Sequence, residues 1–493
     1  MNPIRKTFLG GVAAVALTGA FVAGGNVSLI QPVFAEAVKV EAPQAPSFAD
    51  VVEAVSPAVV SVRVKASVKP ASNDGNQRGF REGFGNLPEG HPLRRFFEDQ
   101  QRANPRRDRR SPRNFGTSQG SGFFVSDDGY VVTNNHVVAN GDEFTIVMND
   151  GVELDAKMIG TDPKTDLAVL KVERAEKFTY VDFAQGKSRV GEWVVAVGNP
   201  FGLGGTVTAG IVSAAGRDIG SGPYDDFLQI DAAVNKGNSG GPAFNLRGEV
   251  IGVNTAIFSP SGGNVGIAFA ISAKTSKEVV GDLIREGSVT RGWLGVAIQP
   301  VSEDIADSLG LDSATGAIVS EASPGSPADK AGMLSRDVIV AVDGKNVKDA
   351  KALSRMIAAY EPDEIVKIEV VRNGEKRVID VTLGTLDQPK EAAAGSNSQP
   401  DEKSAIELSD FGMSIIPDED GVRVSSVEQN GAAAEKGLRV GDLIVSVNGK
   451  ETRSVTDVGQ AVAQAMEDDR KAVLFQLRNN ERNRFIALPV NQG

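Results

Sequence analysis

Gly237-Asn238-Ser239-Gly240-Gly241-Pro242 places one serine among three glycines, a setting typical of a catalytic nucleophile. A serine hydroxyl attacks a carbonyl carbon only when a neighbouring base accepts its proton. Glycines let the backbone turn sharply, so that N–H groups can point at the oxygen that becomes negative. The position of the histidines therefore decides which fold could carry this serine.

The chain has two histidines, His91 and His136, and both precede Ser239. The serine stretch also fits G-x-S-x-G, the nucleophile elbow of α/β-hydrolases, but that fold needs a histidine after the serine. The chymotrypsin order of His, Asp and Ser agrees with the sequence. The subtilisin order would need Asp127 or Asp128 as the acid, and both stand in a turn-like Ser-Asp-Asp-Gly.

His136 follows an apolar, strand-like run and precedes a predicted turn, so we interpret it as the general base for Ser239. A triad also needs an acid between them to hold the imidazole tautomer. Asp166 is favoured because it begins the apolar run Leu167–Val172 directly after a turn, whereas Asp162 precedes a proline and is typical of a turn residue. The other acids available are Asp142, Asp150, Asp155, Asp182, Asp218, Asp225, Asp226 and Asp231.

The turn around the serine predicts an oxyanion hole. The backbone N–H groups of Gly237 and Ser239 are the expected donors, and Asn238 between them shapes the turn. The chain contains no cysteine, so it has neither a disulfide framework nor a thiolate metal site, and two histidines argue against a His-rich zinc site. No metal or organic cofactor is implied.

Length and charge bound the architecture. At 493 residues the chain suggests two to four domains, and its net charge of −12 argues against a nucleic-acid partner. Residues 1–35 are predicted to form a signal peptide, because Arg5 and Lys6 precede an apolar run and Val33-Phe34-Ala35 suits cleavage after Ala35. Cleavage after Ala37 and an uncleaved membrane anchor are the alternatives; no second stretch is long and apolar enough to span a bilayer.

Short apolar runs separated by turn residues indicate a mainly β protein between residues 46 and 287. The apolar alternation from Phe48 to Val64 is a strand pattern, and four further strands are expected. Residues 65–117 are rich in Arg, Gly, Asn and Pro and predict a long loop. The further strands are expected at Gly122–Val125, Phe144–Met148, Leu167–Val172 and Trp193–Val197.

The C-terminal half contains an internal repeat, in which Asp337–Lys345 matches Asp442–Lys450. Each unit spans roughly 90 residues, which favours two domains, at 288–387 and 405–491, over a short-period solenoid. Residues 388–404 are rich in Ala, Ser, Gln, Glu and Pro and are interpreted as a flexible linker.

Three blocks closely resemble the catalytic blocks of the HtrA/Deg family of exported serine proteases: Thr133–Val138, Lys164–Leu170 and Gly237–Pro242. The resemblance covers nearly the whole mature chain. It implies a chymotrypsin-like double β-barrel followed by two PDZ domains of α+β type, with His136, Asp166 and Ser239 as the triad. It also implies that residues 65–117 form a regulatory loop, Arg217–Asp226 a sensor loop, and Thr255–Gly263 a loop near the specificity pocket.

Each repeat unit carries an apolar-Gly-apolar turn before a strand, at Leu294-Gly295-Val296 and Phe411-Gly412-Met413. Such a turn can present backbone N–H groups to the carboxylate of a peptide C-terminus, and the following strand can accept the peptide as an added strand. The resemblance to PDZ domains supports peptide binding by both units. The first unit departs from the PDZ pattern in one place, because Arg336 stands where Gly441 stands in the second.

These observations predict a periplasmic, ATP-independent serine endopeptidase that degrades unfolded or damaged proteins in protein quality control under stress. The resemblance also implies homotrimers, with larger cages on substrate binding. A holdase chaperone or peptide-binding adaptor with proteolysis switched off is one alternative. A secreted esterase with the same triad is another, but it would leave the PDZ-like units without a use.

Overall fold

The structure is a computed structural model of the chain. It describes the residues 47–67, 115–202, 204–259, 263–386, 406–418, 420–468, 470–479 and 482–490. The predicted signal peptide and linker lie outside the described residues, as does most of the predicted loop 65–117.

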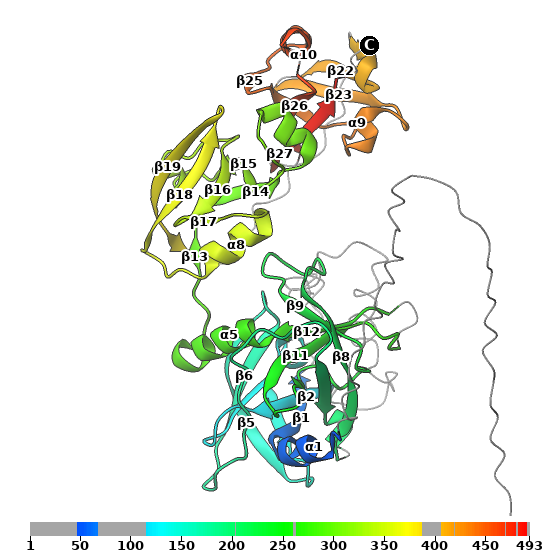
Figure 1. Ribbon diagram of the computed structural model, residues 1–493, viewed down its shortest axis with the longest axis vertical. Helices are drawn as coiled ribbons and strands as arrows, with labels where there is room; N and C mark the ends of the chain where they lie inside the picture. The colour runs from blue at the N-terminus through cyan, green and yellow to red at the C-terminus, as the bar shows by residue number, and fades with distance from the viewer. Residues whose placement is uncertain are drawn as a thin grey trace, which may run out of the picture. The chain divides into compact units, whose positions relative to one another are not determined.

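Two closed six-stranded antiparallel barrels form the N-terminal half of the described chain (Figure 1), as the family resemblance implies. The first has the order β1-β2-β3-β6-β5-β4 and the second β10-β11-β12-β9-β8-β7. Their strands are β1 Val59–Ser67, β2 Phe115–Phe124, β3 Tyr130–Asn134, β4 Glu143–Val147, β5 Glu153–Asp162, β6 Leu167–Val172, β7 Trp193–Gly198, β8 Thr206–Arg217, β9 Phe227–Ile230, β10 Pro242–Phe244, β11 Val250–Ile257 and β12 Ala268–Ser272.

Alternating residues build each barrel core. Val60, Val62 and Val64 of β1 are buried in the core of the first barrel, as the two-residue period of a strand requires. All four further predicted strands are confirmed within β2, β4, β6 and β7. The strands β1 and β2 also extend to Ser67 and back to Phe115, so each strand enters the range predicted as loop.

The strand expectation was wrong for the start of the domain. Ala49–Val55 form the helix α1, followed by a 3₁₀ turn at Ser56–Ala58. The apolar residues Phe48, Val51, Val52 and Val55 are spaced as on one face of a helix, and all four pack against the core of the second barrel. The three- and four-residue spacing was therefore more informative than the apparent alternation.

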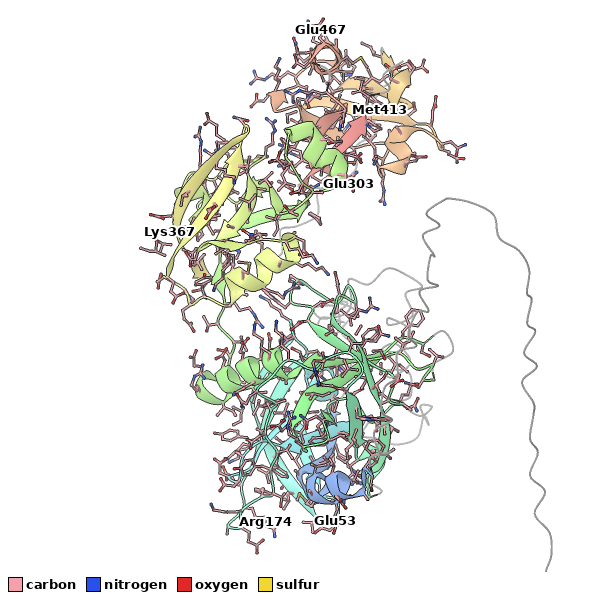
Figure 2. The ribbon with its side chains drawn as sticks, in the orientation of Figure 1. Glu53, Arg174, Glu303, Lys367, Met413 and Glu467 are labelled. Carbon is pink, nitrogen blue, oxygen red and sulfur yellow. The ribbon has the colours of Figure 1, made fainter. Side chains whose placement is uncertain are left out.

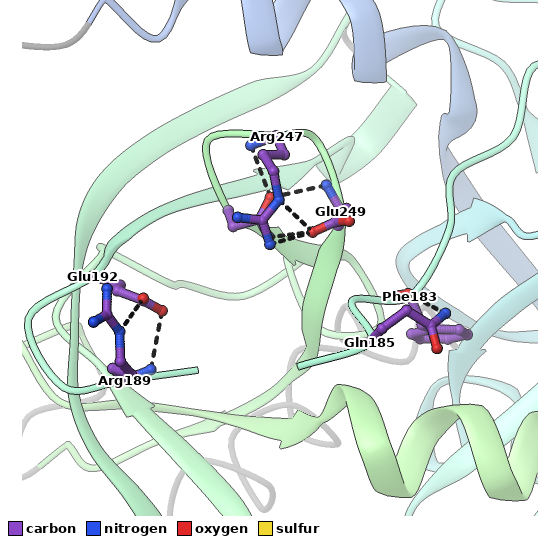
Figure 3. A network of polar contacts seen from close by, with 7 residues as sticks. Phe183, Gln185, Arg189, Glu192, Arg247 and Glu249 are labelled. Carbon is purple, nitrogen blue, oxygen red and sulfur yellow. Dashed lines mark hydrogen bonds and ion pairs between the residues drawn. The ribbon is translucent and has the colours of Figure 1, made fainter. Parts of the chain in front are cut away.

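Capping interactions define the ends of the helix α5, Ala273–Glu286, and exposed ion pairs close two turns of the barrels. The helix α5 begins at Ser272, whose side chain accepts a hydrogen bond from the N–H of Thr275, and it ends at Gly287 with a φ of 73°. Exposed ion pairs join Arg189 to Glu192 and Arg247 to Glu249, each at 2.7 Å, and close local turns near β7 and β11 (Figure 3). Such pairs stabilise a fold by less than about 1 kcal/mol each.

The two repeat units have corresponding elements. The first contains β13 Gly292–Trp293, β14 Val296–Pro300, α6 Glu303–Leu309, β15 Ala317–Ala322, α7 Pro327–Lys330, β16 Val338–Val342, β17 Lys345–Asn346, α8 Ala350–Ala358, β18 Ile365–Arg372, β19 Glu375–Thr382 and β20 Gly384–Thr385. The second contains β21 Ile406–Leu408, η3 Ser409–Phe411, β22 Met413–Asp418, β23 Gly421–Val427, α9 Ala432–Glu435, β24 Leu443–Val447, β25 Lys450–Glu451, α10 Val455–Glu467, β26 Ala472–Asn479 and β27 Arg482–Pro489.

The sheet orders of the two units differ at one edge. The first sheet runs β14-β15-β16-β18-β19, and the second runs β21-β22-β23-β24-β26-β27. The strands β17 and β25 pair with β16 and β24. Because β14 and β22 follow the matching glycine turns, β21 is an additional strand on the second sheet.

Candidate active site

His136 lies in a single helical turn that stands between the strands β3 and β4 of the first barrel. The strand β3 ends at Asn134, and Asn135–Val138 form the short helix α4, where the sequence predicted a plain turn. Val137 and Val138 of this turn are buried in the first barrel, which fixes the backbone of His136. The side chain of His136 is 10% exposed, so the ring is largely buried.

Asp166 holds the imidazole at two points. Its Oδ2 lies 2.6 Å from His136 Nδ1, and its Oδ1 accepts a hydrogen bond from the backbone N–H of His136 at 2.9 Å. The carbonyl of Asp166 accepts hydrogen bonds from the backbone N–H of Asn135 and from Nδ2 of Asn134. A carboxylate that accepts from Nδ1–H selects the tautomer in which Nε2 is the proton acceptor.

The backbone of Asp166 is left-handed, with a φ of 59°. Aspartate tolerates this region better than most residues, but the conformation must still be held in place. The end of the preceding strand β5 supplies the support through Asp162, which is 4% exposed. Both guanidinium nitrogens of Arg291 donate to its carboxylate, at 3.0 and 2.5 Å, and Thr165 Oγ1 donates at 2.5 Å.

This network corrects the interpretation of Asp162 as a turn residue. Asp162 ends β5, and its ion pair with Arg291 is buried on both sides. The ring of Tyr224 lies 4.7 Å from the guanidinium carbon of Arg291, which adds a cation–π contact. Burial lowers the pKa of the neighbouring Lys164 ammonium. The sequence alone could not reveal this partner, because 129 residues separate Arg291 from Asp162.

Ser239 is fully buried in a turn whose glycines permit close packing. Gly237 has a φ of 95°, and a Cβ there would lie 2.6 Å from Cβ of Pro200. Gly240 has a φ of 85°, and its Cβ would lie 2.3 Å from the carbonyl oxygen of Ser121. Any larger side chain at these two positions would displace the turn.

The turn is oriented by hydrogen bonds with the strand β2 and with neighbouring loops. Ser121 Oγ donates to the carbonyl of Gly237 at 2.6 Å, and the backbone N–H of Asn199 donates to the same hydroxyl at 2.9 Å. The N–H of Asn238 donates to the carbonyl of Asn235 at 3.0 Å. Within the described part of the chain, the N–H groups of Gly237 and Ser239 donate to no protein group. These are the two donors that the sequence predicts, and the bonding of Asn238 agrees with its shaping role.

The hydroxyl of Ser239 donates to the carbonyl of Thr255 at 3.3 Å. A hydroxyl carries one hydrogen, so proton transfer to an imidazole requires Oγ–H to turn away from that carbonyl. In this conformation the hydroxyl of Ser239 is directed at the carbonyl of Thr255.

Ser121 was not identified from the sequence. It stands in Gly120-Ser121-Gly122 of the strand β2, and a serine between two glycines was the available signal for a closely packed backbone. A Cβ on Gly120 would lie 2.9 Å from the carbonyl of Ser239, which shows how closely the strand β2 approaches the serine turn. Arg291 was missed as well, because only the fold brings it to the site. Thr255 was expected as the first residue of a loop near the specificity pocket, but it lies in the strand β11.

The predicted peptide-binding turns lie before corresponding strands. Gly295 has a φ of 79° and Gly412 a φ of 66°, which suits a turn that presents N–H groups. Leu294 and Phe411 are buried in the cores of their own units. Figure 2 marks Met413 at the start of β22.

Neither a metal centre nor a membrane-spanning helix is found in the described residues. Within those ranges, no group of three or more His, Asp or Glu side chains is arranged to hold a metal ion. None of the helices described is long and apolar enough to cross a membrane.

Comparison with known proteins agrees with the fold. The trypsin-like peptidase domain matches residues 120–253, and the PDZ domain matches 318–372 and 423–477. A probable periplasmic serine endoprotease DegP-like from Rhizobium meliloti (strain 1021) is 54% identical over 99% of this chain and 100% of its own. The relative of that name from Halomonas elongata is 39% identical over 91% of this chain and 94% of its own.

A solved HtrA-type protease, AlgWS227A with decapeptide, has a TM-score of 0.57 and 37% identity, and the match covers 71% of this chain and 100% of that one. Fold and comparisons define a periplasmic serine endoprotease with a trypsin-like domain and two PDZ domains. The chain belongs to the family of DegP-like proteases of the HtrA type.

Proposed function

We propose that this protease hydrolyses peptide bonds of unfolded or damaged polypeptides by acyl transfer, with Ser239 as the nucleophile. The observation that carries the proposal is the 2.6 Å contact between His136 Nδ1 and Asp166 Oδ2 beside a glycine-set serine. Ser239 Oγ bonds to the scissile carbonyl carbon while its proton moves to Nε2 of His136. His136 then gives that proton to the leaving amine as the C–N bond breaks, and water hydrolyses the acyl-enzyme by the same route.

The oxyanion that forms on the carbonyl oxygen needs donors that are already in place. The N–H groups of Gly237 and Ser239 fill this role in our proposal. Two hydrogen bonds that orient the turn support this role. Ser121 Oγ donates to the carbonyl of Gly237, and the N–H of Asn238 donates to the carbonyl of Asn235. Asn238 acts through the turn, since its own N–H is bonded.

The first PDZ unit is proposed to capture polypeptide C-termini through Leu294, Gly295 and Val296. Within the described residues, β14 has no partner on its outer edge, so an extended peptide can add there as a strand. The solved relative with a decapeptide supports peptide binding by this class of protease. Capture raises the local concentration of the rest of the polypeptide near the barrels.

The family resemblance supports a homotrimer, with larger cages when substrate is bound, and a chaperone activity that does not need cleavage. Light scattering of the mature chain, with and without an unfolded substrate, would measure the mass of both assemblies. A monomer under both conditions would contradict the proposed assembly.

The function is tested with a permanently unfolded protein as substrate, for the mature chain and for Ser239→Ala. We expect fragments from the native chain and turnover slowed by a factor of about 10⁶ in the variant, because the nucleophile is absent. Aggregation of the same substrate, followed in parallel, reports the chaperone activity. Equal fragmentation by both proteins would contradict the role of Ser239, and suppressed aggregation without fragmentation would favour a holdase.

A further inference from the structure

The two PDZ units differ in what lies along the strand that should receive a peptide. In the first unit β14 is the edge of its sheet among the described residues. In the second unit the outer edge of β22 is already paired with β21, in antiparallel register Ile406↔Ile415, Glu407↔Ser414 and Leu408↔Met413. The chain itself therefore occupies the edge that corresponds to the open edge of the first unit.

The direction of β21 is that of a bound peptide. A peptide that adds to a PDZ sheet runs antiparallel to the receiving strand and ends at the glycine turn. The strand β21 also ends at that turn, because Leu408 lies opposite Met413, the first residue of β22. Leu408 packs against the core of the second unit, as does Val455 of α10, and the last side chain of a peptide would do the same.

The glycine turn of the second unit also forms a hydrogen bond with the chain itself. The N–H of Gly412 donates to the carbonyl of Ser409 at 3.1 Å, so a backbone oxygen of the chain stands where a peptide carboxylate would accept. The matching N–H of Gly295 donates to no group in the part of the chain that the structure describes.

The two receiving strands, β22 and β14, also differ in how deeply their side chains are buried. Met413 and Ile415 of β22 are 2% and 0% exposed. Their counterparts Val296 and Ile298 in β14 are only partly buried. A ligand can stabilise β14 by covering its partly exposed apolar side chains at the open edge. A ligand could do the same for β22 only after it displaced β21.

We propose that β21 is an internal ligand that closes the second PDZ unit to peptide C-termini. The inference rests on the proposed peptide-binding role of the glycine turns. It implies that only the first unit binds peptides in the resting chain. Only the four residues 409–412 join β21 to β22, so its effective concentration is about 1 mM. A free peptide of equal intrinsic affinity at about 10 µM competes at a disadvantage of roughly a hundredfold.

The test uses the full chain with Ser239→Ala, so that the probe is not cleaved, and with Gly295→Val to block the first unit. A Cβ on Gly295 would lie 2.2 Å from Cβ of Ser326. The probe is a fluorescent peptide that copies residues 404–408, Ser-Ala-Ile-Glu-Leu, with a free carboxylate. The same peptide with an amidated end is the negative probe.

Leu408→Glu places a charge where β21 packs on the core and should release the strand. We expect peptide affinity to rise at least tenfold over the parent chain with native β21. Val440→Glu is the matched control, because it makes the same kind of change at a side chain of the second unit that is 63% exposed. Equal affinity of the parent and Leu408→Glu chains, with an unchanged unfolding transition, would overturn the proposal.

Hydrogen exchange supplies a readout that does not depend on the peptide sequence. The amides of Met413–Ile415 should exchange at least tenfold more slowly than those of Val296–Ile298, and Leu408→Glu should remove the difference. Equal exchange in the native chain would contradict the closed edge. If the chain with native Gly295 binds no peptide while Leu408→Glu gains binding, the proposed capture site is wrong and the role of β21 stands.

Discussion

His136 and Asp166 are joined twice, once through the imidazole Nδ1 at 2.6 Å and once through the backbone N–H at 2.9 Å. The second bond ties the carboxylate to the turn that carries the ring, so the two side chains are positioned as a unit. An amide in place of the carboxylate would keep the shape of this contact but could offer its NH₂ group to Nδ1.

Asp166→Asn should therefore leave the fold intact and slow turnover by a factor of about 10⁴, because the wrong imidazole tautomer is stabilised. The measurement is steady-state cleavage of an unfolded protein or a chromogenic peptide, together with thermal unfolding. Asp162→Asn is not a neutral control, since it breaks the ion pair with Arg291. An Asp166→Asn chain that retains a tenth or more of the native turnover rate would contradict the assigned role.

Gly237→Ala tests the oxyanion turn. The new Cβ would meet Pro200 at 2.6 Å on a backbone with a φ of 95°, so the turn must move. We expect turnover to slow by a factor of roughly 10² to 10³, the effect of losing one oxyanion donor. KM for a peptide substrate should change little, because the N–H groups act mainly on the transition state.

Gly191→Ala is the matched control for Gly237→Ala. Gly191 has a nearly equal φ of 91°, but a Cβ there meets no atom within 4 Å. This variant carries the backbone strain without the clash, so its turnover rate should stay native. A native turnover rate for Gly237→Ala with an intact unfolding transition would remove Gly237 from the oxyanion hole.

Much of the fold could be predicted from local patterns. Alternating apolar residues identified strands such as Leu167–Val172, because every second side chain of a strand points into the barrel and is buried there. The position of Asp166 at the start of that strand was enough to favour it over the other acids. The same kind of reasoning failed for Phe48–Val55, where helical and strand-like spacings coincide over a short apolar segment.

The rest depends on contacts between distant parts of the chain. Arg291 and Asp162 are charged residues in ordinary local sequences, and only the folded chain shows that they form a buried pair. The pairing of β21 with β22 is similar, because Ile406-Glu407-Leu408 is too short to carry a period of its own. Short-range patterns indicate which residues are buried, whereas the identity of the residues that pair with one another depends on the whole fold.

Tyr360 offers a test of the first PDZ unit at alkaline pH. Its hydroxyl donates to Asp343 Oδ2 at 2.6 Å, and this hydrogen bond, with some burial, raises the pKa of Tyr360 to about 12. The same bond lowers the pKa of Asp343. Because the folded pKa of the phenol lies above its ordinary value of about 10, the stabilisation is complete below pH ~10 and is lost as the pH rises towards 12.

Ultraviolet titration of phenolate absorbance would show this transition as a late step near pH 12. Tyr360→Phe should remove that step, and Asp343→Asn should move it to lower pH because the charged acceptor is lost. An unchanged titration curve in Tyr360→Phe would show that the late step belongs to another tyrosine.

Arg336 occupies the position at which the second PDZ unit has Gly441, and both residues are left-handed, with φ values of 74° and 95°. The positive φ places Arg336, which carries a long side chain, in a region of the backbone that favours glycine. Left-handed backbone costs a non-glycine residue about 1–2 kcal/mol. Burial also lowers the pKa of the Arg336 guanidinium, and its Nε has no hydrogen-bond partner among the described residues.

Arg336→Gly should therefore raise the free energy of unfolding by about 1 kcal/mol, since it removes both the backbone strain and the buried polar atom. Arg336→Ala separates the two causes, because it removes the guanidinium and keeps the strained φ. We expect its stability to lie between those of the native and Arg336→Gly chains when measured by urea unfolding. A less stable Arg336→Gly chain would show that packing of the long side chain outweighs the strain, and that the arginine is retained for its contacts.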